Sequence, residues 1–198
     1  PRYLDLCLKL WKKTTDYLYD PAERLYFRDS RYFTPREKNG KKVFWSRGNG
    51  WVLAGLARVL MAMPALHPER PAMERLFKDM AGRVAELQTP DGTWHSSLLD
   101  PASYPAKETS GTGFFCYAMA WGIRTGLLPD ARFGPVVERA YAALTACVDP
   151  NGRLGWVQPI GQDPRLVRPW DTDAYGVGAY LLASSELVRI NVRDAAHG

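Results

Sequence analysis

The stretch Gly113-Phe114-Phe115-Cys116-Tyr117-Ala118-Met119-Ala120 carries no charged residue and decides how this chain must fold. Two further stretches have the same character: Gly50-Trp51-Val52-Leu53-Ala54-Gly55-Leu56 and Gly176-Val177-Gly178-Ala179-Tyr180-Leu181-Leu182-Ala183. All three combine glycine and alanine with large apolar side chains, and all three lie in segments of helical periodicity. Because a helix that is apolar on every side must be covered on every side, they predict three helices of an inner layer.

A second kind of helix is expected before each inner helix. The inner helices have the approximate ranges 48–63, 109–125 and 172–190. Their partners have the approximate ranges 3–19, 71–88 and 131–148. Each partner has one apolar stripe and one charged face, which is typical of a helix that is buried on one side only. The alternation therefore predicts an all-α fold in which outer helices cover inner ones.

The connections between the helices also repeat. Prolines at positions 21, 90 and 150 each open a turn that leads to a short extended apolar segment. These prolines are 69 and 60 residues apart, and each unit holds two helices. Such a period is typical of stacked helical hairpins. The whole chain, residues 1–198, is therefore predicted to be part of one domain, to which it supplies about three helical hairpins.

A long segment without helical periodicity lies before each inner helix. These segments cover residues 27–47, 95–108 and 155–171. Loops of this length usually carry function, and all three lead to the N-terminal end of an inner helix. Helix N-termini present backbone N–H groups and a partial positive charge. One end of the hairpin stack is therefore predicted to bind an anionic ligand.

The composition argues against several classes of protein. The net charge is +5, but no five like charges are contiguous, which favours a small anionic substrate over a nucleic acid. Cys7, Cys116 and Cys147 are odd in number and widely spaced, unlike a disulfide framework. The three histidines lack the spacing of metal ligands, and no apolar run is long enough for a transmembrane helix. We therefore expect no metal, no nucleic acid and no membrane span.

The most informative motif, Trp45-Ser46-Arg47-Gly48-Asn49-Gly50-Trp51, opens the first inner helix. Arg47 can hold a carboxylate through two parallel hydrogen bonds, and the two Trp rings can stack on a sugar. The glycines let a ligand approach the backbone closely, and Asn49 between them is a further candidate substrate-binding residue. The same residues also fit a simpler interpretation, namely a buried pair of Trp side chains with Asn49 as a helix cap and Arg47 on the surface. Both interpretations stay open at this point.

The start of the second inner helix holds another candidate group. Thr109 or Ser110 is expected to cap this helix. Glu108 precedes them and is expected to orient hydroxyl groups or to hold Arg47. All three are therefore candidate substrate-binding residues.

Two further segments are candidates for the same site. Trp170 leads a capping sequence, Asp171-Thr172-Asp173, before the third inner helix. Arg28 and Asp29 follow the first extended apolar segment. They form either a surface ion pair of little energetic weight or part of the pocket that contains Arg47.

The 45–51 motif resembles that of glycoside hydrolase family 105, the unsaturated rhamnogalacturonyl hydrolases, and of the related family 88. Weaker matches follow in the order of that family at 25–27, 88–94, 108–112 and 176–186. The resemblance implies a six-hairpin (α/α)6 barrel. It also implies hydrolytic removal of a 4,5-unsaturated uronic acid from the non-reducing end of pectin-derived oligosaccharides of the rhamnogalacturonan type. The reaction hydrates a vinyl ether and uses neither a metal nor an organic cofactor.

The resemblance also assigns roles to single residues. Trp45, Arg47 and Trp51 match the sugar pocket of the family, in which the arginine would grip the uronate carboxylate and Trp51 would line the ring. Arg28 stands where many members have a histidine, so its role differs from the family pattern.

The general acid of the family is an aspartate that lies before the region matching residues 3–19. It is therefore expected upstream of Pro1, and Asp29 is the local carboxylate expected to assist the reaction. Three hairpins in place of six leave an open, apolar edge. We therefore expect the chain to form a homo-oligomer or to require its missing N-terminal half.

Two other functions remain open alternatives. One is a sugar epimerase on the same barrel, for which His95 would be the available acid–base group. The other is a non-catalytic helical repeat that binds a protein partner. A bacterial cytoplasmic and a periplasmic location fit the sequence equally well.

Overall fold

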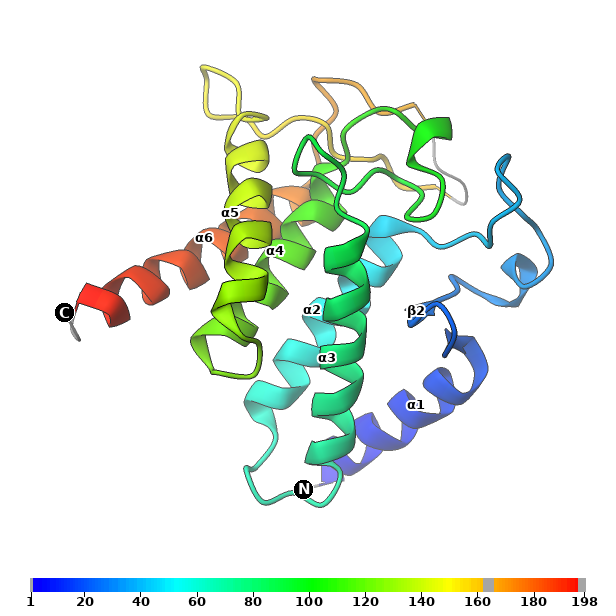
Figure 1. The fold of residues 1–198 in the computed structure, drawn as a ribbon, viewed down its shortest axis with the longest axis vertical. Helices are drawn as coiled ribbons and strands as arrows, with labels where there is room; N and C mark the ends of the chain where they lie inside the picture. Colours follow the sequence, from blue (N-terminus) through cyan, green and yellow to red (C-terminus); the bar gives the residue numbers. More distant parts are fainter. Residues whose placement is uncertain (1, 162–165, 196–198) are drawn as a thin grey trace.

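The computed structural model describes residues 2–161 and 166–195, and six α-helices account for most of them (Figure 1). The helices are α1 (Arg2–Leu18), α2 (Ser46–Ala62), α3 (Arg70–Glu86), α4 (Thr109–Arg124), α5 (Asp130–Thr145) and α6 (Ala174–Ala195). The smaller elements are a ribbon of β1 (Tyr19–Asp20) and β2 (Leu25–Tyr26), and two 3-10 turns, η1 (Ser30–Tyr32) and η2 (Pro101–Ser103). The predicted all-α fold of three helical hairpins is confirmed. Within the described residues, no helix combines the length and the apolar character that a membrane span needs.

The helices form two layers, as the two kinds of sequence segment predicted. In Figure 1, α3 and α5 lie in front of α2 and α4, and the long loops gather at the upper end of the molecule. The inner helix α4 packs against α2 on one side and α6 on the other, and α5 covers it from outside. Its residues from Thr109 to Ile123 are all buried. The central apolar stretch is therefore the core of this curved stack of three helical hairpins, which we call the arc.

Small residues let the inner helices approach one another closely. A Cβ atom at Gly113 would lie 2.9 Å from the Cβ of Ala179 on α6, which is closer than packed side chains allow. A Cβ at Gly50 on α2 would lie 3.1 Å from the Cβ of Phe114. These contacts explain why glycine and alanine, which are poor at filling space, recur in the inner helices.

The repeated turns are closed by aspartate side chains. The carboxylate of Asp20 accepts hydrogen bonds from two backbone N–H groups of its own turn, as does that of Asp149. Asp91 accepts one from Thr93 in the equivalent turn after α3. Such turns direct the chain, as it leaves each outer helix, to the end of the arc at which the next inner helix starts. They thereby place the three long loops at one end of the molecule.

Candidate substrate site

The motif at residues 45–51 forms the first turn of α2 and one wall of a cavity. The cavity has a volume of about 250 Å³, and its lining includes Trp45, Gly48, Trp51 and Arg28. The end of α1 and the residues around β2 close its other side. Four residues proposed from the sequence for substrate binding, Arg28, Trp45, Asn49 and Trp51, therefore line one cavity.

Trp45 is buried, whereas Trp51 is about half exposed. The side chain of Trp45 is 7% exposed, and its indole N–H has no hydrogen-bond partner among the described residues. Trp51 is 51% exposed, and one side of its ring rests on Phe114 of α4, with centroids 4.2 Å apart. The contact with Phe114 fixes the plane of Trp51 and leaves the rest of its ring accessible. Trp51 therefore offers an exposed flat surface, whereas the unpaired donor of Trp45 is buried beside the cavity.

Arg28 lies against the aromatic wall of this cavity. Its guanidinium carbon is 5.6 Å from the ring centroid of Trp45 and 6.0 Å from that of Tyr32. Arg28 also forms an ion pair with Asp29, which in turn binds Arg31 at 3.0 Å. Hydrogen bonds from Arg31, together with that from Arg28, lower the pKa of Asp29 to about 2. Asp29 is therefore ionised at neutral pH and orients arginine side chains.

Arg47 lies on the neighbouring face of the first turn of α2 and points across the arc. Its Nη1 atom donates a hydrogen bond to the carbonyl oxygen of Gln158 at 2.6 Å, and the carbonyl of Pro159 is 3.4 Å away. Its guanidinium carbon lies 5.3 Å from the ring centroid of Tyr175, at the start of α6. The described residues give no partner to its Nε and Nη2 atoms. Arg47 is thus half-buried and linked to the start of the third inner helix.

Glu108 caps α4 from a fully buried position. Its carboxylate accepts hydrogen bonds from the backbone N–H of Ser110 at 2.9 Å and of Gly111 at 2.7 Å, and from the Ser110 hydroxyl. It also accepts the backbone N–H of Gln158 at 3.3 Å. The expectation that Thr109 or Ser110 caps α4 is wrong, because Glu108 takes that position.

Thr109 has a different role at the same helix end. Its hydroxyl donates to the carbonyl of Gly155 at 2.8 Å, and its backbone N–H donates to the carbonyl of Trp156 at 3.0 Å. Together with Glu108 it fastens the loop before α6 onto the start of α4. Among the described residues, Glu108 is linked to Arg47 through the backbone of Gln158.

Asn49 is also not a cap, because α2 begins three residues before it. Its side chain is buried and clamps the backbone of β2, accepting the N–H of Tyr26 at 2.8 Å and donating to the Tyr26 carbonyl at 3.0 Å. A further bond joins it to the carbonyl of Trp45. Asn49 therefore holds the wall of the cavity in place.

The structure places Trp170 outside the cavity that holds Trp45 and Trp51. Trp170 is 61% exposed and lines a separate hollow of about 320 Å³ with Arg153 and Asp171. Arg168 lies over its ring at 5.7 Å. Trp170 is thus an aromatic surface on the same loop face, but not part of the pocket that begins at α2.

Three residues at this site were not predicted from the sequence as site residues: Gln158, Tyr175 and Phe114. Phe114 and Tyr175 belong to the starts of the second and third inner helices, as the 45–51 motif belongs to the first. Equivalent positions in the repeat were the signal that could have indicated them. Gln158 acts through its backbone, which side-chain chemistry does not reveal.

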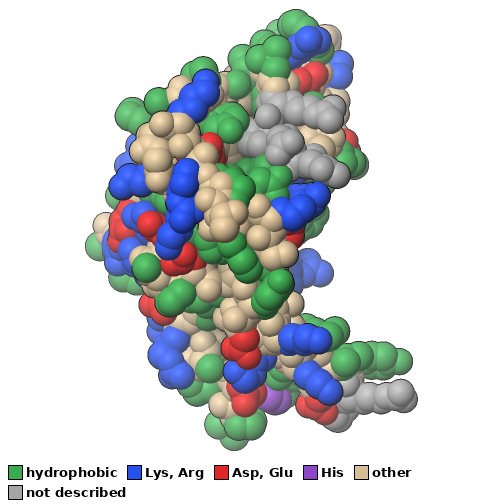
Figure 2. All heavy atoms as spheres, turned by 90° about the vertical axis from the view of Figure 1, so that its right-hand side faces the viewer, with side chains coloured by type: hydrophobic (Ala, Val, Ile, Leu, Met, Phe, Trp, Pro, Cys, Tyr) green, Lys and Arg blue, Asp and Glu red, His purple; other side chains and the backbone are tan. Residues whose placement is uncertain are grey.

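The loop over residues 27–47 carries the positive charge of the chain. It contains seven Lys and Arg and two Asp and Glu residues, so its net charge is +5, the same as that of the whole chain. Figure 2 looks onto the side of α1 and this loop and shows Lys and Arg side chains spread between apolar ones. This basic loop contributes Arg28 to the cavity wall, and its net positive charge favours anionic ligands. Within the described part of the chain, no group of three His, Cys, Asp or Glu side chains is arranged to hold a metal ion.

The chain is a two-layered arc of helices, with a cavity lined by Trp and Arg side chains at the loop end. The sequence profile of Glycosyl Hydrolase Family 88 matches residues 1–191, and the chain belongs to this family. A solved structure named "Glycosyl hydrolase family 88 from Bacteroides vulgatus" superposes with a TM-score of 0.91 and 39% identity. The match covers 94% of this chain and 56% of that one, which confirms about half of a six-hairpin (α/α)6 barrel.

Two curated relatives carry the same name, unsaturated 3S-rhamnoglycuronyl hydrolase. The one from Formosa agariphila is 45% identical over 196 residues, and the match covers 96% of this chain. The one from Alteromonas sp. (strain LOR) is 42% identical over 188 residues, which is 95% of this chain. The chain spans 52% and 46% of their lengths, so it corresponds to about half of each relative.

Proposed function

We propose that this chain forms the substrate-binding half of a hydrolase that removes a 4,5-unsaturated uronic acid from the non-reducing end of rhamnose-containing oligosaccharides. Rhamnogalacturonan-type oligosaccharides from pectin are one candidate class of substrate. The names of the relatives point to rhamnoglycuronyl oligosaccharides as a second class. The observation that carries the proposal is the half-buried guanidinium of Arg47, next to the cavity of Trp45 and Trp51, to whose Nε and Nη2 atoms the described residues give no partner.

Arg47 is built to receive a carboxylate. Its Nη1 atom is occupied by the Gln158 carbonyl. The open Nε and Nη2 atoms form one edge of the planar guanidinium, and two parallel hydrogen bonds from such an edge match the two oxygens of a carboxylate. The uronate ring would then lie across the first turn of α2, against the exposed ring of Trp51. The basic loop over residues 27–47 would attract such an anion.

The chemistry of an unsaturated uronate needs one proton and one water molecule. An acid donates a proton to C4 of the ring, and water adds to C5, which is bonded to the ring oxygen. The resulting hemiketal opens and releases the leaving sugar. Asp29 is no proton donor at neutral pH, because its arginine partners hold its pKa at about 2. The general acid is therefore proposed to lie in the part of the relatives that this chain does not span, and Asp29 to assist by orienting Arg28.

The two alternative functions receive less support from the contacts. An epimerase would need His95, but the Nδ1 atom of this histidine lies 3.1 Å from the carbonyl of Pro101, and its Nε2 atom faces Asp91 at 3.6 Å. It does not line the cavity of Trp45. A protein-binding repeat would have no need for the open donors of Arg47.

The expected result of an activity test is a fall in ultraviolet absorbance. The protein that carries this chain is incubated with lyase-digested rhamnogalacturonan and, separately, with an unsaturated rhamnoglycuronyl oligosaccharide, and the absorbance of the unsaturated uronyl group is followed. Hydration removes the double bond, so the absorbance falls in at least one of the two samples. Unchanged absorbance in both, or a rise that reports cleavage by elimination, would contradict the proposal.

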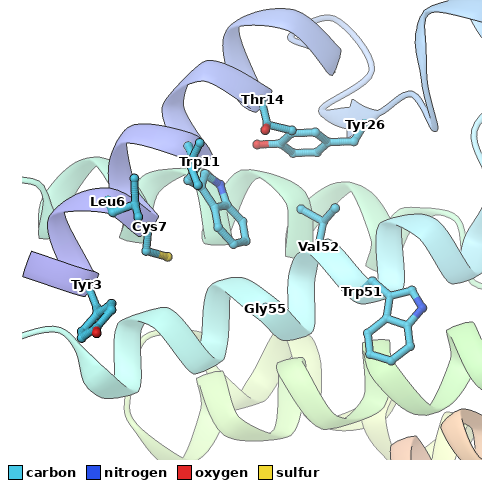
Figure 3. Close-up of a pocket in the computed structure, with 10 residues that line it drawn as sticks. Tyr3, Leu6, Cys7, Trp11, Thr14, Tyr26, Trp51, Val52 and Gly55 are labelled. Atoms are coloured by element: carbon cyan, nitrogen blue, oxygen red, sulfur yellow. The ribbon is translucent and has the colours of Figure 1, made fainter.

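A second proposal concerns the open edge of the arc. A groove of about 620 Å³ runs between α1 and α2, and apolar side chains such as Leu6, Trp11 and Val52 line it (Figure 3). Leu10 also lines this groove. Leu6 and Leu10 are 52% and 55% exposed. Elsewhere each outer helix packs chiefly on the inner helix that precedes it, α3 on α2 and α5 on α4. By this repeat, we propose that the groove seats an inner-type helix from the half of the relatives that this chain does not span.

The groove is tested by capture of that other half. The segment of the Formosa agariphila relative that lies outside the match is mixed with this chain, and the complex is measured by size-exclusion chromatography with light scattering. We expect a one-to-one complex, which Leu10→Glu prevents and Leu66→Glu does not, because Leu66 is 97% exposed and lies outside the groove. A stable monomer that captures nothing would refute the proposal, as would a homodimer closed through the same groove.

A further inference from the structure

We propose that Tyr175 is a positioning residue that holds the guanidinium of Arg47 in its carboxylate-binding orientation. The inference rests on the proposed function, in which Arg47 receives the uronate. Tyr175 lies in the first turn of α6, far from Arg47 in the sequence. It is partly buried, and burial raises the pKa of its hydroxyl above the usual range, so the hydroxyl is protonated and donates.

One backbone carbonyl connects the two side chains. The hydroxyl of Tyr175 donates a hydrogen bond to the Gln158 carbonyl, which also accepts the bond from Nη1 of Arg47 at 2.6 Å. In addition, the Arg47 guanidinium carbon is 5.3 Å from the Tyr175 ring centroid, within the range of a cation–π contact. Nη1 of Arg47 also lies 3.5 Å from the Tyr175 hydroxyl. Tyr175 therefore acts on Arg47 through its hydroxyl, through the shared acceptor and through its ring.

The shared carbonyl is itself fixed by the rest of the site. The N–H of Gln158 donates to the buried carboxylate of Glu108, and the preceding N–H, of Val157, donates to the carbonyl of Asp171 at 2.9 Å. Trp156 adopts a left-handed backbone conformation with φ of 56°, which non-glycine residues rarely adopt. This conformation directs the chain so that Gln158 meets Arg47. The starts of α2, α4 and α6 thus all contact the backbone of one residue, Gln158.

This arrangement has a consequence for substrate binding. An arginine side chain that is free to rotate loses conformational entropy when it binds a ligand. Here one nitrogen of Arg47 donates to a fixed carbonyl and one face of its plane is covered, while the described residues give its Nε and Nη2 atoms no partner. Tyr175 thereby reduces the entropy that Arg47 loses on binding, and its effect should appear only when Arg47 is present.

A double-mutant cycle tests this dependence. In the protein that carries this chain, Tyr175→Leu is expected to raise KM for an unsaturated uronyl substrate by about tenfold, with kcat changed by less than about twofold, as couplings between contacting residues allow. In the Arg47→Ala background the same change is expected to have almost no further effect. Tyr175→Phe keeps the ring and should show a smaller rise in KM. Multiplying penalties in the double mutant would overturn the inference.

A spectroscopic measurement separates this inference from the proposed function. The Nε–H resonance of Arg47, assigned by its loss in Arg47→Ala, should shift in Tyr175→Leu, because the aromatic ring no longer covers the guanidinium. An unshifted resonance would overturn the positioning role. A shifted resonance in a protein that leaves the uronyl absorbance unchanged would support the positioning role and refute the function. Tyr180→Phe is the matched control, since it lies on the same helix and its hydroxyl contacts Thr145 at 3.3 Å.

Discussion

Arg47→Ala should lower kcat/KM of the protein that carries this chain by about two to three orders of magnitude on an unsaturated uronyl substrate. The reason is that the substituted enzyme would bury the carboxylate of the substrate without its charged partner. Loss of one member of a buried, hydrogen-bonded charge pair costs about 2–5 kcal/mol, and each 1.4 kcal/mol corresponds to about a factor of ten. The measurement is the initial rate of loss of uronyl absorbance over a range of substrate concentrations.

Arg47→Lys distinguishes charge from geometry. Lysine keeps the positive charge but lacks the planar pair of donors, so we expect it to recover only a small part of the lost activity. Arg75→Ala is the matched control, because Arg75 is exposed on the outer helix α3. Its activity should equal that of the unsubstituted protein. Full activity of Arg47→Ala in a correctly folded protein would show that the substrate carboxylate is bound elsewhere.

The fold could be predicted from the sequence because its decisive signal is local. Inner helices need apolar residues on every face, and the three stretches around residues 50, 113 and 176 have them. The proline turns gave the hairpin period for the same reason, since each turn is closed by an aspartate within a few residues of the proline. Sequence patterns shorter than one hairpin were therefore enough to predict half of a barrel.

The site was only partly predictable because its contacts join distant segments. The 45–51 motif indicated Trp45, Arg47 and Trp51, whose side-chain chemistry is local information. The partner of Arg47 is a backbone carbonyl 111 residues away, and no side chain identifies it in the sequence. Glu108 shows the same limit, since one of its four donors is the N–H of Gln158, 50 residues further along. Trp170 shows the opposite case, because an aromatic side chain suits a sugar site but its loop places it in a separate hollow.

Glu108→Ala should destabilise the protein more than any other single substitution considered, because Glu108 closes the connection between α4 and the loop before α6. Without its carboxylate, the N–H groups of Ser110, Gly111 and Gln158 lose their acceptor inside the protein. Each buried donor left unsatisfied costs about 1–3 kcal/mol, so we expect the free energy of unfolding to fall by about 3–4 kcal/mol and Tm by about 10 °C.

Thermal unfolding followed by circular dichroism gives this loss directly, and Glu138→Ala is the control because Glu138 is exposed on α5. That control should stay within about 0.5 kcal/mol of the unsubstituted protein. Glu108→Gln keeps the size of the side chain but turns one acceptor into a donor that faces other donors, so it should also be destabilised. Because the Gln158 peptide is held by Glu108 and in turn holds Arg47, both variants should raise KM even below their Tm. An unfolding temperature unchanged by Glu108→Ala would mean that water or a rearranged loop satisfies these donors, and that Glu108 is not what joins the second and third inner helices at the site.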